Sequence, residues 1–115
     1  MIKTKRIYEP ATADDGFRIL VDRLWPRGIQ KDKTKMDLWL KEIAPSDALR
    51  EWFSHDPKKW EQFKRRYEAE LKDKQELLRS ILSEEKRRKT VTLLYSARDE
   101  EYNNAVALSI ILQTM

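Results

Sequence analysis

Cysteine is absent from this sequence of 115 residues. Without a thiol the chain cannot form a disulfide, a thiolate metal site or a cysteine nucleophile, which excludes rhodanese-type and cysteine-phosphatase chemistry. Histidine occurs only once, as His55, so no second histidine can join it in a metal site. The sequence therefore predicts neither a metal nor another cofactor.

Long apolar runs and glycine are scarce as well. No run approaches the roughly 18 residues of a membrane span, and the N-terminus lacks an apolar stretch of signal-peptide length. We therefore expect a cytoplasmic protein with no membrane partner. The chain contains only two glycines, which leaves few tight turns and favours a compact, helix-rich fold.

The length predicts a single domain over residues 1–115, with one core that buries roughly two thirds of the surface of the unfolded chain. Charged residues make up 38% of the sequence, and the formal net charge is +4. High charge together with a lack of cysteine is typical of heat-adapted proteins, so the composition predicts a thermophilic origin.

Three segments have the pattern of β-strands, at residues 2–8, 17–24 and 90–95. The third, TVTLLY, is apolar and β-branched without alternation, which predicts a central strand buried on both faces. Residues 9–16 form a loop of eight residues between the first two strands. This is shorter than most parallel crossovers, so the spacing alone favours an antiparallel pairing.

Helical periodicity begins at Ser46, which is expected to cap a short helix containing Leu49, Trp52 and Phe53. Asp56-Pro57 predicts another helix start. The apolar stripe that follows allows either one helix over residues 57–88 or two helices with a break near Asp73, and typical helix lengths favour the break.

Two further segments complete the predicted elements. Residues 36–44 fit either a short strand or a helical turn. The last helix, from about residue 101 to 113, is apolar nearly all round. It must therefore be buried, or pack on a partner such as a second copy in a homodimer.

The segment LVDRLWPRGI, residues 20–29, places charged and aromatic groups directly after a predicted strand. In α/β proteins such groups are presented to ligands at the carboxyl ends of strands. Arg23 and Arg27 bracket Trp25-Pro26 and could hold phosphate or carboxylate through their planar guanidinium groups, with Asp22 orienting an arginine or acting as a base. The alternative is a structural Asp–Arg pair beneath a Trp-Pro lid.

The loop after the strand at 90–95 is a second candidate anion site, because a helix begins beyond it. Its candidate ligand-binding residues are Ser96, Arg98 and Asn103. The alternative is that Ser96 and Asp99 only cap the helix.

Lys41 and His55 are two further candidate site residues. If the protein is an enzyme, Asp22 is the expected base, with Lys41 or His55 as its electrostatic partner. His55 could instead stack on Trp60 as a helix staple.

The basic helix over residues 57–72 could bind nucleic acid or protein, although interleaved acidic residues favour a solvated face.

The segments LVDRLWPRGI, WLKEIAPS (39–46), 49–71 and TLLYSARDEEYNNA (92–105) resemble the YeaO-like branch of the domain of unknown function 488 family. The resemblance implies a three-layer α/β domain with a small, mostly parallel sheet flanked by helices, and hence a short parallel crossover between the first two strands. It also implies a shared pocket framed by Asp22, Arg23, Trp25, Pro26, Arg27, Lys41, Pro45, Ser46, Tyr95, Ser96 and Arg98.

The chain departs from that family at Asn104, where many members carry a histidine. Longer members have a Cys-His-Arg run matching residues 103–105 and a cysteine near Tyr95. A catalytic histidine or metal ligand at this loop is therefore missing here. The resulting hypothesis is an arginine-rich pocket that binds an anionic small molecule, such as a nucleotide or phosphorylated metabolite, with hydrolysis or group transfer as the expected reaction if catalysis occurs.

Overall fold

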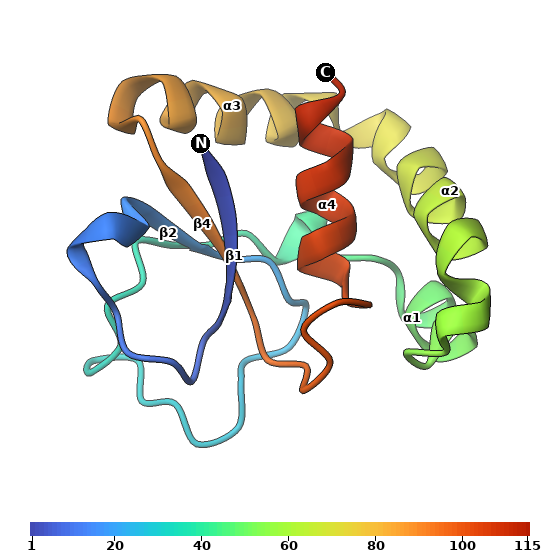
Figure 1. Ribbon diagram of the computed structural model, residues 1–115, viewed down its shortest axis with the longest axis horizontal. Helices are drawn as coiled ribbons and strands as arrows, with labels where there is room; N and C mark the ends of the chain where they lie inside the picture. The colour runs from blue at the N-terminus through green and yellow to red at the C-terminus, as the bar shows by residue number, and fades with distance from the viewer.

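The computed structural model describes residues 1–115 as a sheet of four strands with helices packed against it (Figure 1). The strands are β1 (Ile2–Arg6), β2 (Phe17–Leu20), β3 (Leu38–Trp39) and β4 (Val91–Tyr95). Their spatial order is β1-β4-β2-β3, and every neighbouring pair is parallel. The predicted α/β class with a small parallel sheet is confirmed.

The first two strands are parallel to each other but are not neighbours, because β4 lies between them. The antiparallel pairing favoured by loop length is therefore wrong, and the parallel arrangement implied by the family resemblance is correct. Because the strands are short, the loop can run from the carboxyl end of β1 back to the amino end of β2. It enters β2 through Gly16, whose φ is +64° and whose Cβ, if present, would lie 2.2 Å from the carbonyl oxygen of Thr90.

Four α-helices follow the N-terminal strands: α1 (Asp47–Phe53), α2 (Trp60–Glu70), α3 (Gln75–Arg88) and α4 (Asn104–Gln113). Short 3₁₀ helices occupy Ala13–Asp15, Lys41–Ile43, Pro57–Lys59 and Leu71–Lys74. Ser46 caps α1 by accepting a hydrogen bond from the amide of Leu49, as predicted, and Asp56 caps the turn that begins at Pro57. The segment 57–88 is broken beside Asp73, because the turn at 71–74 separates α2 from α3.

The other two ambiguous segments are also resolved. Residues 36–44 contain both a short strand, β3, and a 3₁₀ turn. The last helix begins at Asn104, later than predicted, because Asp99 first closes a turn by accepting from the amides of Glu101 and Tyr102. Its cap is Asn103, which accepts from the amide of Val106. The prediction that Ser96 and Asp99 cap the helix was wrong.

The two faces of the sheet are covered differently. One face, with Ile19, Val21 and Leu93, packs on the helices in a core cluster of 19 buried residues. The other face presents Leu20 and Leu94, which are covered by Trp25 from the loop after β2 and by Trp39 at the end of β3. In Figure 1 the helices lie above and to the right of the sheet, and this cyan loop lies below it.

The last helix, α4, packs against β1, β4 and α2. Its buried residues are Ala105, Ala107, Leu108, Ile111 and Leu112. This explains its apolar composition without a partner chain. None of the helices is both long and apolar enough to cross a membrane.

Candidate functional site

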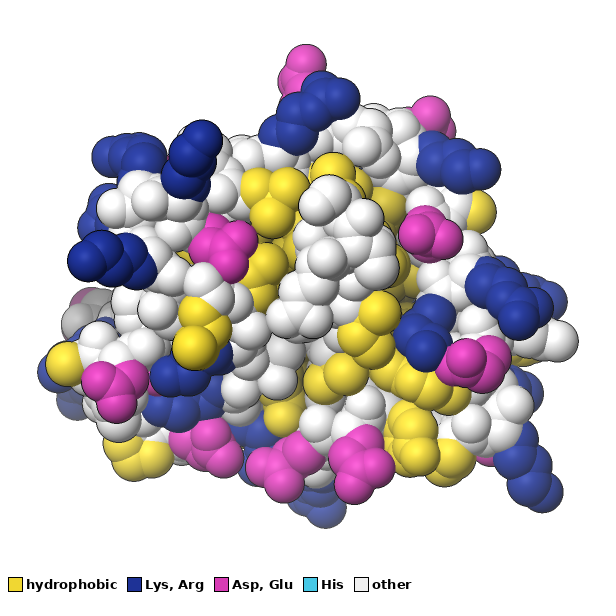
Figure 2. Space-filling model, turned by 45° about the horizontal axis from the view of Figure 1, so that its top comes forward, with side chains coloured by type: hydrophobic (Ala, Val, Ile, Leu, Met, Phe, Trp, Pro, Cys, Tyr) yellow, Lys and Arg dark blue, Asp and Glu magenta, His cyan; other side chains and the backbone are white.

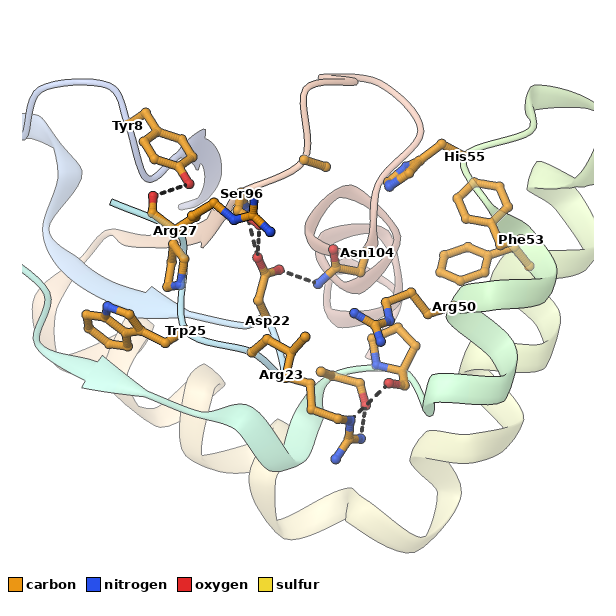
Figure 3. Close-up of a pocket in the computed structure, with 16 residues that line it drawn as sticks. Tyr8, Asp22, Arg23, Trp25, Arg27, Arg50, Phe53, His55, Ser96 and Asn104 are labelled. Carbon is orange, nitrogen blue, oxygen red and sulfur yellow. Dashed lines mark hydrogen bonds between the residues drawn. The ribbon is translucent and has the colours of Figure 1, made fainter. Parts of the chain in front are cut away.

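A pocket of about 330 Å³ opens at the carboxyl edge of the sheet, between the ends of β2 and β4 and the helices α1 and α4 (Figure 3). This is the edge at which parallel α/β sheets bind ligands. Its charged lining side chains are three arginines and one carboxylate, besides a histidine. They are Asp22, Arg23, Arg27, Arg50 and His55.

Asp22 joins the two strand ends to the start of α4. Its Oδ2 accepts hydrogen bonds from the Ser96 amide at 2.9 Å and the Ser96 hydroxyl at 2.7 Å. Its Oδ1 accepts from Asn104 Nδ2 at 3.1 Å, and the same amide group also donates to the carbonyl of Val21. Both carboxylate oxygens are therefore engaged within the chain, as the dashed lines in Figure 3 show.

Arg23 reaches from the same loop to the segment that precedes α1. Its Nη2 donates to the carbonyl oxygen of Ala44 at 2.9 Å, and its Nε donates to that of Pro45 at 3.4 Å. Ala44 and Pro45 are both buried. The guanidinium group thus donates to two carbonyl oxygens in the pocket wall and links the loop after β2 to the segment that leads into α1.

Arg27 differs from Arg23, because its exposed side chain makes no hydrogen bond or ion pair within the chain. Arg27 lines the pocket together with Ser96 and Asp22, and its side chain is drawn in Figure 3. The backbone around it is fixed, since the carbonyl oxygen of Arg27 accepts from the Tyr8 hydroxyl at 2.8 Å. Of the three arginines in the pocket, Arg27 is therefore the one whose guanidinium group has no partner within the chain.

The opposite wall is made by α1 and the residues that follow it. Arg50 points toward the cavity in Figure 3 and pairs with exposed Asp47 at 3.0 Å. His55 also points toward the cavity, and its Nδ1 lies 2.9 Å from the carbonyl oxygen of Tyr102. The same wall contains the buried side chains of Phe53 and Phe63, whose stacked rings have centroids 4.1 Å apart. This wall therefore combines buried aromatic rings with the exposed side chains of Arg50 and His55.

The structure brings six of the nine predicted site residues to the pocket: Asp22, Arg23, Trp25, Arg27, His55 and Ser96. Of the additional residues implied by the family resemblance, Pro26 and Pro45 also line it, whereas Ser46 and Tyr95 do not. Ser46 instead donates to the Glu70 carboxylate. Tyr95 is buried in the core, where burial together with Glu100 and Glu9 raises the pKa of its hydroxyl.

Three predicted residues do not line the pocket. Lys41 lies outside it, with its ammonium group 5.4 Å from the ring centroid of Trp39. Asn103 is fully buried as the cap of α4 and donates to the carbonyl of Asp99. Arg98 is exposed on the preceding loop.

Sequence reasoning missed Arg50 and did not give Asn104 a role in the site. Arg50 follows Asp47 at the spacing of an ordinary surface ion pair, so no motif distinguished it. Asn104 was noted only for what it replaces, and its contact with Asp22 depends on the folded arrangement of β2 and α4.

His55 does not act as a staple on Trp60. Its imidazole instead packs on Phe53, with ring centroids 5.6 Å apart, and bonds to Tyr102. Trp60 packs on Phe53, Phe63 and Tyr102. No group of three or more histidine, aspartate or glutamate side chains lies close enough to hold a metal ion.

Three of the six basic residues in the segment 57–72 contact other groups within the chain. Lys64 pairs with Glu61 at 2.6 Å, and this pairing lowers the pKa of the Glu61 carboxyl. The guanidinium of Arg66 lies 4.0 Å from the ring centroid of Trp52, and Lys59 donates to the backbone carbonyl of Trp52. Acidic side chains interrupt the basic ones, so the helix does not present a continuous cationic stripe.

The fold and pocket define a small parallel α/β domain with an arginine-lined pocket at the carboxyl edge of its sheet. The chain belongs to the family whose model is described as "Inactive DUF488-N3 subclade", which matches residues 1–115. This confirms the resemblance found in the sequence motifs.

Two relatives illustrate how far the similarity extends. The chain is 44% identical to "Uncharacterized protein YeaO" of Escherichia coli (strain K12), over 99% of this chain and 98% of the relative. It is 39% identical to "Uncharacterized protein Rv3073c" of Mycobacterium tuberculosis (strain H37Rv), over 96% of this chain and 92% of the relative. No solved structure matches the chain.

Proposed function

We propose that the pocket binds an anionic small molecule, such as a nucleotide or phosphorylated metabolite, without converting it. The observation that carries this proposal is the guanidinium of Arg27, which lies in the pocket and has no partner within the chain. Guanidinium groups bind phosphate and carboxylate oxygens through paired N–H donors. Arg50 across the pocket supplies a second cation.

Two further features favour an anion. The lining contains three arginines but only one carboxylate, so its charge is positive. Asn104, the first residue of α4, also lines the pocket, which brings the positive end of that helix dipole toward the ligand. The volume of about 330 Å³ lies at the lower end of the range for small-molecule sites and fits a ligand of mononucleotide size or smaller.

The absence of turnover is inferred from the state of Asp22. A general base needs a free oxygen within reach of a ligand proton. Both oxygens of Asp22 instead accept hydrogen bonds from Ser96 and Asn104. Asn104 occupies the position where the family resemblance implies a histidine, and the family description calls this subclade inactive. A hydrolase or transferase is therefore the less favoured form of the proposal.

The rival proposal, binding of nucleic acid or protein through residues 57–72, has weaker support. It requires a continuous row of free cations, yet Lys59, Lys64 and Arg66 are engaged within the chain, and acidic residues interrupt the basic ones that remain. If the rival proposal were correct, binding to nucleic acid would weaken steeply with added salt.

A thermal-shift and calorimetric screen tests the proposal. Its probes are adenosine 5′-monophosphate, glucose 6-phosphate and phenyl phosphate, each with wild-type protein and with Arg27→Ala. A hydrogen bond to a charged group is worth about 1.5–3 kcal/mol. Removing Arg27 should therefore weaken binding roughly 10- to 150-fold.

The matched control is Arg79→Ala, because Arg79 is an exposed arginine on α3 outside the pocket. This variant should bind as the wild type does. Equal affinity of the Arg27→Ala and wild-type proteins for every bound probe would refute the proposal, as would the absence of binding to all three probes.

A further inference from the structure

We propose that His55 is a specificity-determining residue of this pocket, taking up a proton when a doubly charged phosphate ester binds. The inference rests on the proposed anion-binding function. It adds the charge state of the preferred ligand and names the residue that detects it.

The hydrogen bond from His55 to Tyr102 fixes the tautomer of the imidazole. Nδ1 lies 2.9 Å from the backbone carbonyl oxygen of Tyr102, and a carbonyl oxygen can only accept. Nδ1 must therefore carry the hydrogen. In the neutral ring Nε2 is then a bare acceptor, and in the imidazolium it is a donor.

The backbone holds His55 in position at some conformational cost. Ser54 and His55 follow α1 with φ values of +47° and +55°, both in the left-handed region. Non-glycine residues adopt this region infrequently, because it is less favourable for them than the right-handed region. The turn directs the imidazole toward the cavity, against Phe53 and the loop before α4 (Figure 3).

The charged groups around His55 come from each element that packs near it. Arg50, on α1, is a positive group that lines the same pocket. Asp99, on the loop before α4, is a negative group. The pKa of Asp99 is lowered by hydrogen bonds from the amides of Tyr102 and Glu101 and by the charge of His55. Asp56, the next residue along the chain, is a further carboxylate and caps the following turn.

This arrangement discriminates between ligands by their charge. The terminal oxygens of a fully ionised phosphate ester are acceptors only, so they repel the lone pair of neutral Nε2. Taking a proton from solvent onto Nε2 converts the repulsion into a charge-assisted hydrogen bond. A singly charged sulfate ester of the same shape gains less from the added proton, because its oxygens carry less charge.

Calorimetry with phenyl phosphate and phenyl sulfate at pH 8 tests the inference, because these two probes have nearly the same shape and differ in charge. The second pKa of a phosphate ester is about 6, so phenyl phosphate is doubly charged at this pH. Titrations in buffers with different ionisation enthalpies count the protons taken up. We expect phenyl phosphate to bind at least tenfold more tightly than phenyl sulfate, with uptake approaching one proton.

Two variants distinguish the roles of the two imidazole nitrogens of His55. His55→Gln places an uncharged donor near the position of Nε2, so it should still bind phenyl phosphate but without proton uptake. His55→Asn can keep the hydrogen bond to Tyr102 and tolerates a positive φ, but it has no atom in place of Nε2. It should lose both the affinity gain and the proton uptake.

The outcomes also distinguish this inference from the proposed function. If phenyl phosphate binds wild-type protein with no proton uptake, or if His55→Gln takes up as many protons as the wild type, the role of His55 is refuted and the anion pocket stands. If neither probe binds and the broader screen also finds no ligand, both proposals fail.

Discussion

Arg23 donates from Nη2 to the carbonyl oxygen of Ala44 at 2.9 Å and from Nε to that of Pro45 at 3.4 Å. The two arginines of the LVDRLWPRGI segment therefore have different environments. Arg23 holds the loop after β2 to the segment that leads into α1, whereas Arg27 has no partner within the chain. The sequence had presented the two arginines as an equivalent pair.

Replacing Arg23 should lower the stability of the fold. The protein that remains folded should still bind the ligand. Arg23→Ala leaves two partly buried carbonyl groups without their donors, so we expect a loss of about 1–3 kcal/mol in the free energy of unfolding. Urea denaturation measures this loss, and Arg27→Ala is the matched control that should unfold as the wild type does. An Arg23→Ala protein of unchanged stability would contradict the structural role.

Asp22→Asn should destabilise the protein without creating a new activity. The substituted amide group cannot accept from both Ser96 and Asn104 as the carboxylate does, because one of its two positions is a donor. We expect a cost of about 1–3 kcal/mol in chemical denaturation. A variant as stable as the wild type would show that Asp22 is not the link between β2, β4 and α4.

Asp15 should make the fold sensitive to acid. Burial alone would raise the pKa of its carboxyl group, but hydrogen bonds from Thr12, Lys5 and Arg18 outweigh burial and hold the pKa well below its usual range. Because the folded-state pKa lies below the unfolded value of about 3.9, the stabilisation is present above that pH and is lost as the pH falls.

The matched variant is Asp15→Asn, which leaves the largely buried Arg18 without its carboxylate. Removing one member of such a pair costs about 3 kcal/mol near neutral pH. Urea denaturation followed from about pH 5 down to about pH 2 should show the wild type losing stability toward that of the variant. Parallel pH profiles for the two proteins would contradict the role of Asp15.

Asn103 should matter for stability through α4. Its side chain accepts from the amide of Val106 and donates to the carbonyl of Asp99, and the residue is fully buried. Asn103→Ala should cost about 1–2 kcal/mol, as expected for losing a helix cap. Asn103→Asp keeps the capping acceptor and serves as the control, so it should be the more stable of the two variants. The opposite order would contradict the capping assignment.

Local patterns predicted the elements of the fold well. The apolar run at 90–95 became the central strand β4, and Ser46 and Asp56 cap the elements that follow them. These features depend on neighbours within a few residues. The orientation of β1 and β2 did not follow from loop length, because it depends on β4, about 70 residues further along the chain, which lies between them.

The candidate site was also predicted only in part, because some of its contacts depend on residues far apart in the sequence. The position of Arg27 after β2 and of Ser96 after β4 could be inferred, because strand ends in a parallel sheet meet at one edge. The division between Arg23 and Arg27 could not, since it depends on the carbonyls of Ala44 and Pro45 lying beside β2. Arg50 was missed because nothing in the sequence indicates that α1 faces the pocket.

The most direct test of the central claim is an NMR titration of the labelled protein with phenyl phosphate, with adenosine 5′-monophosphate as a second ligand. An anion held by Arg27 should shift the amide signals of Arg27, Ser96, Ala97 and Asn104 together, in a saturable way, and Arg27→Ala should abolish the shifts. Shifts confined to α2, or none at millimolar ligand, would contradict the account.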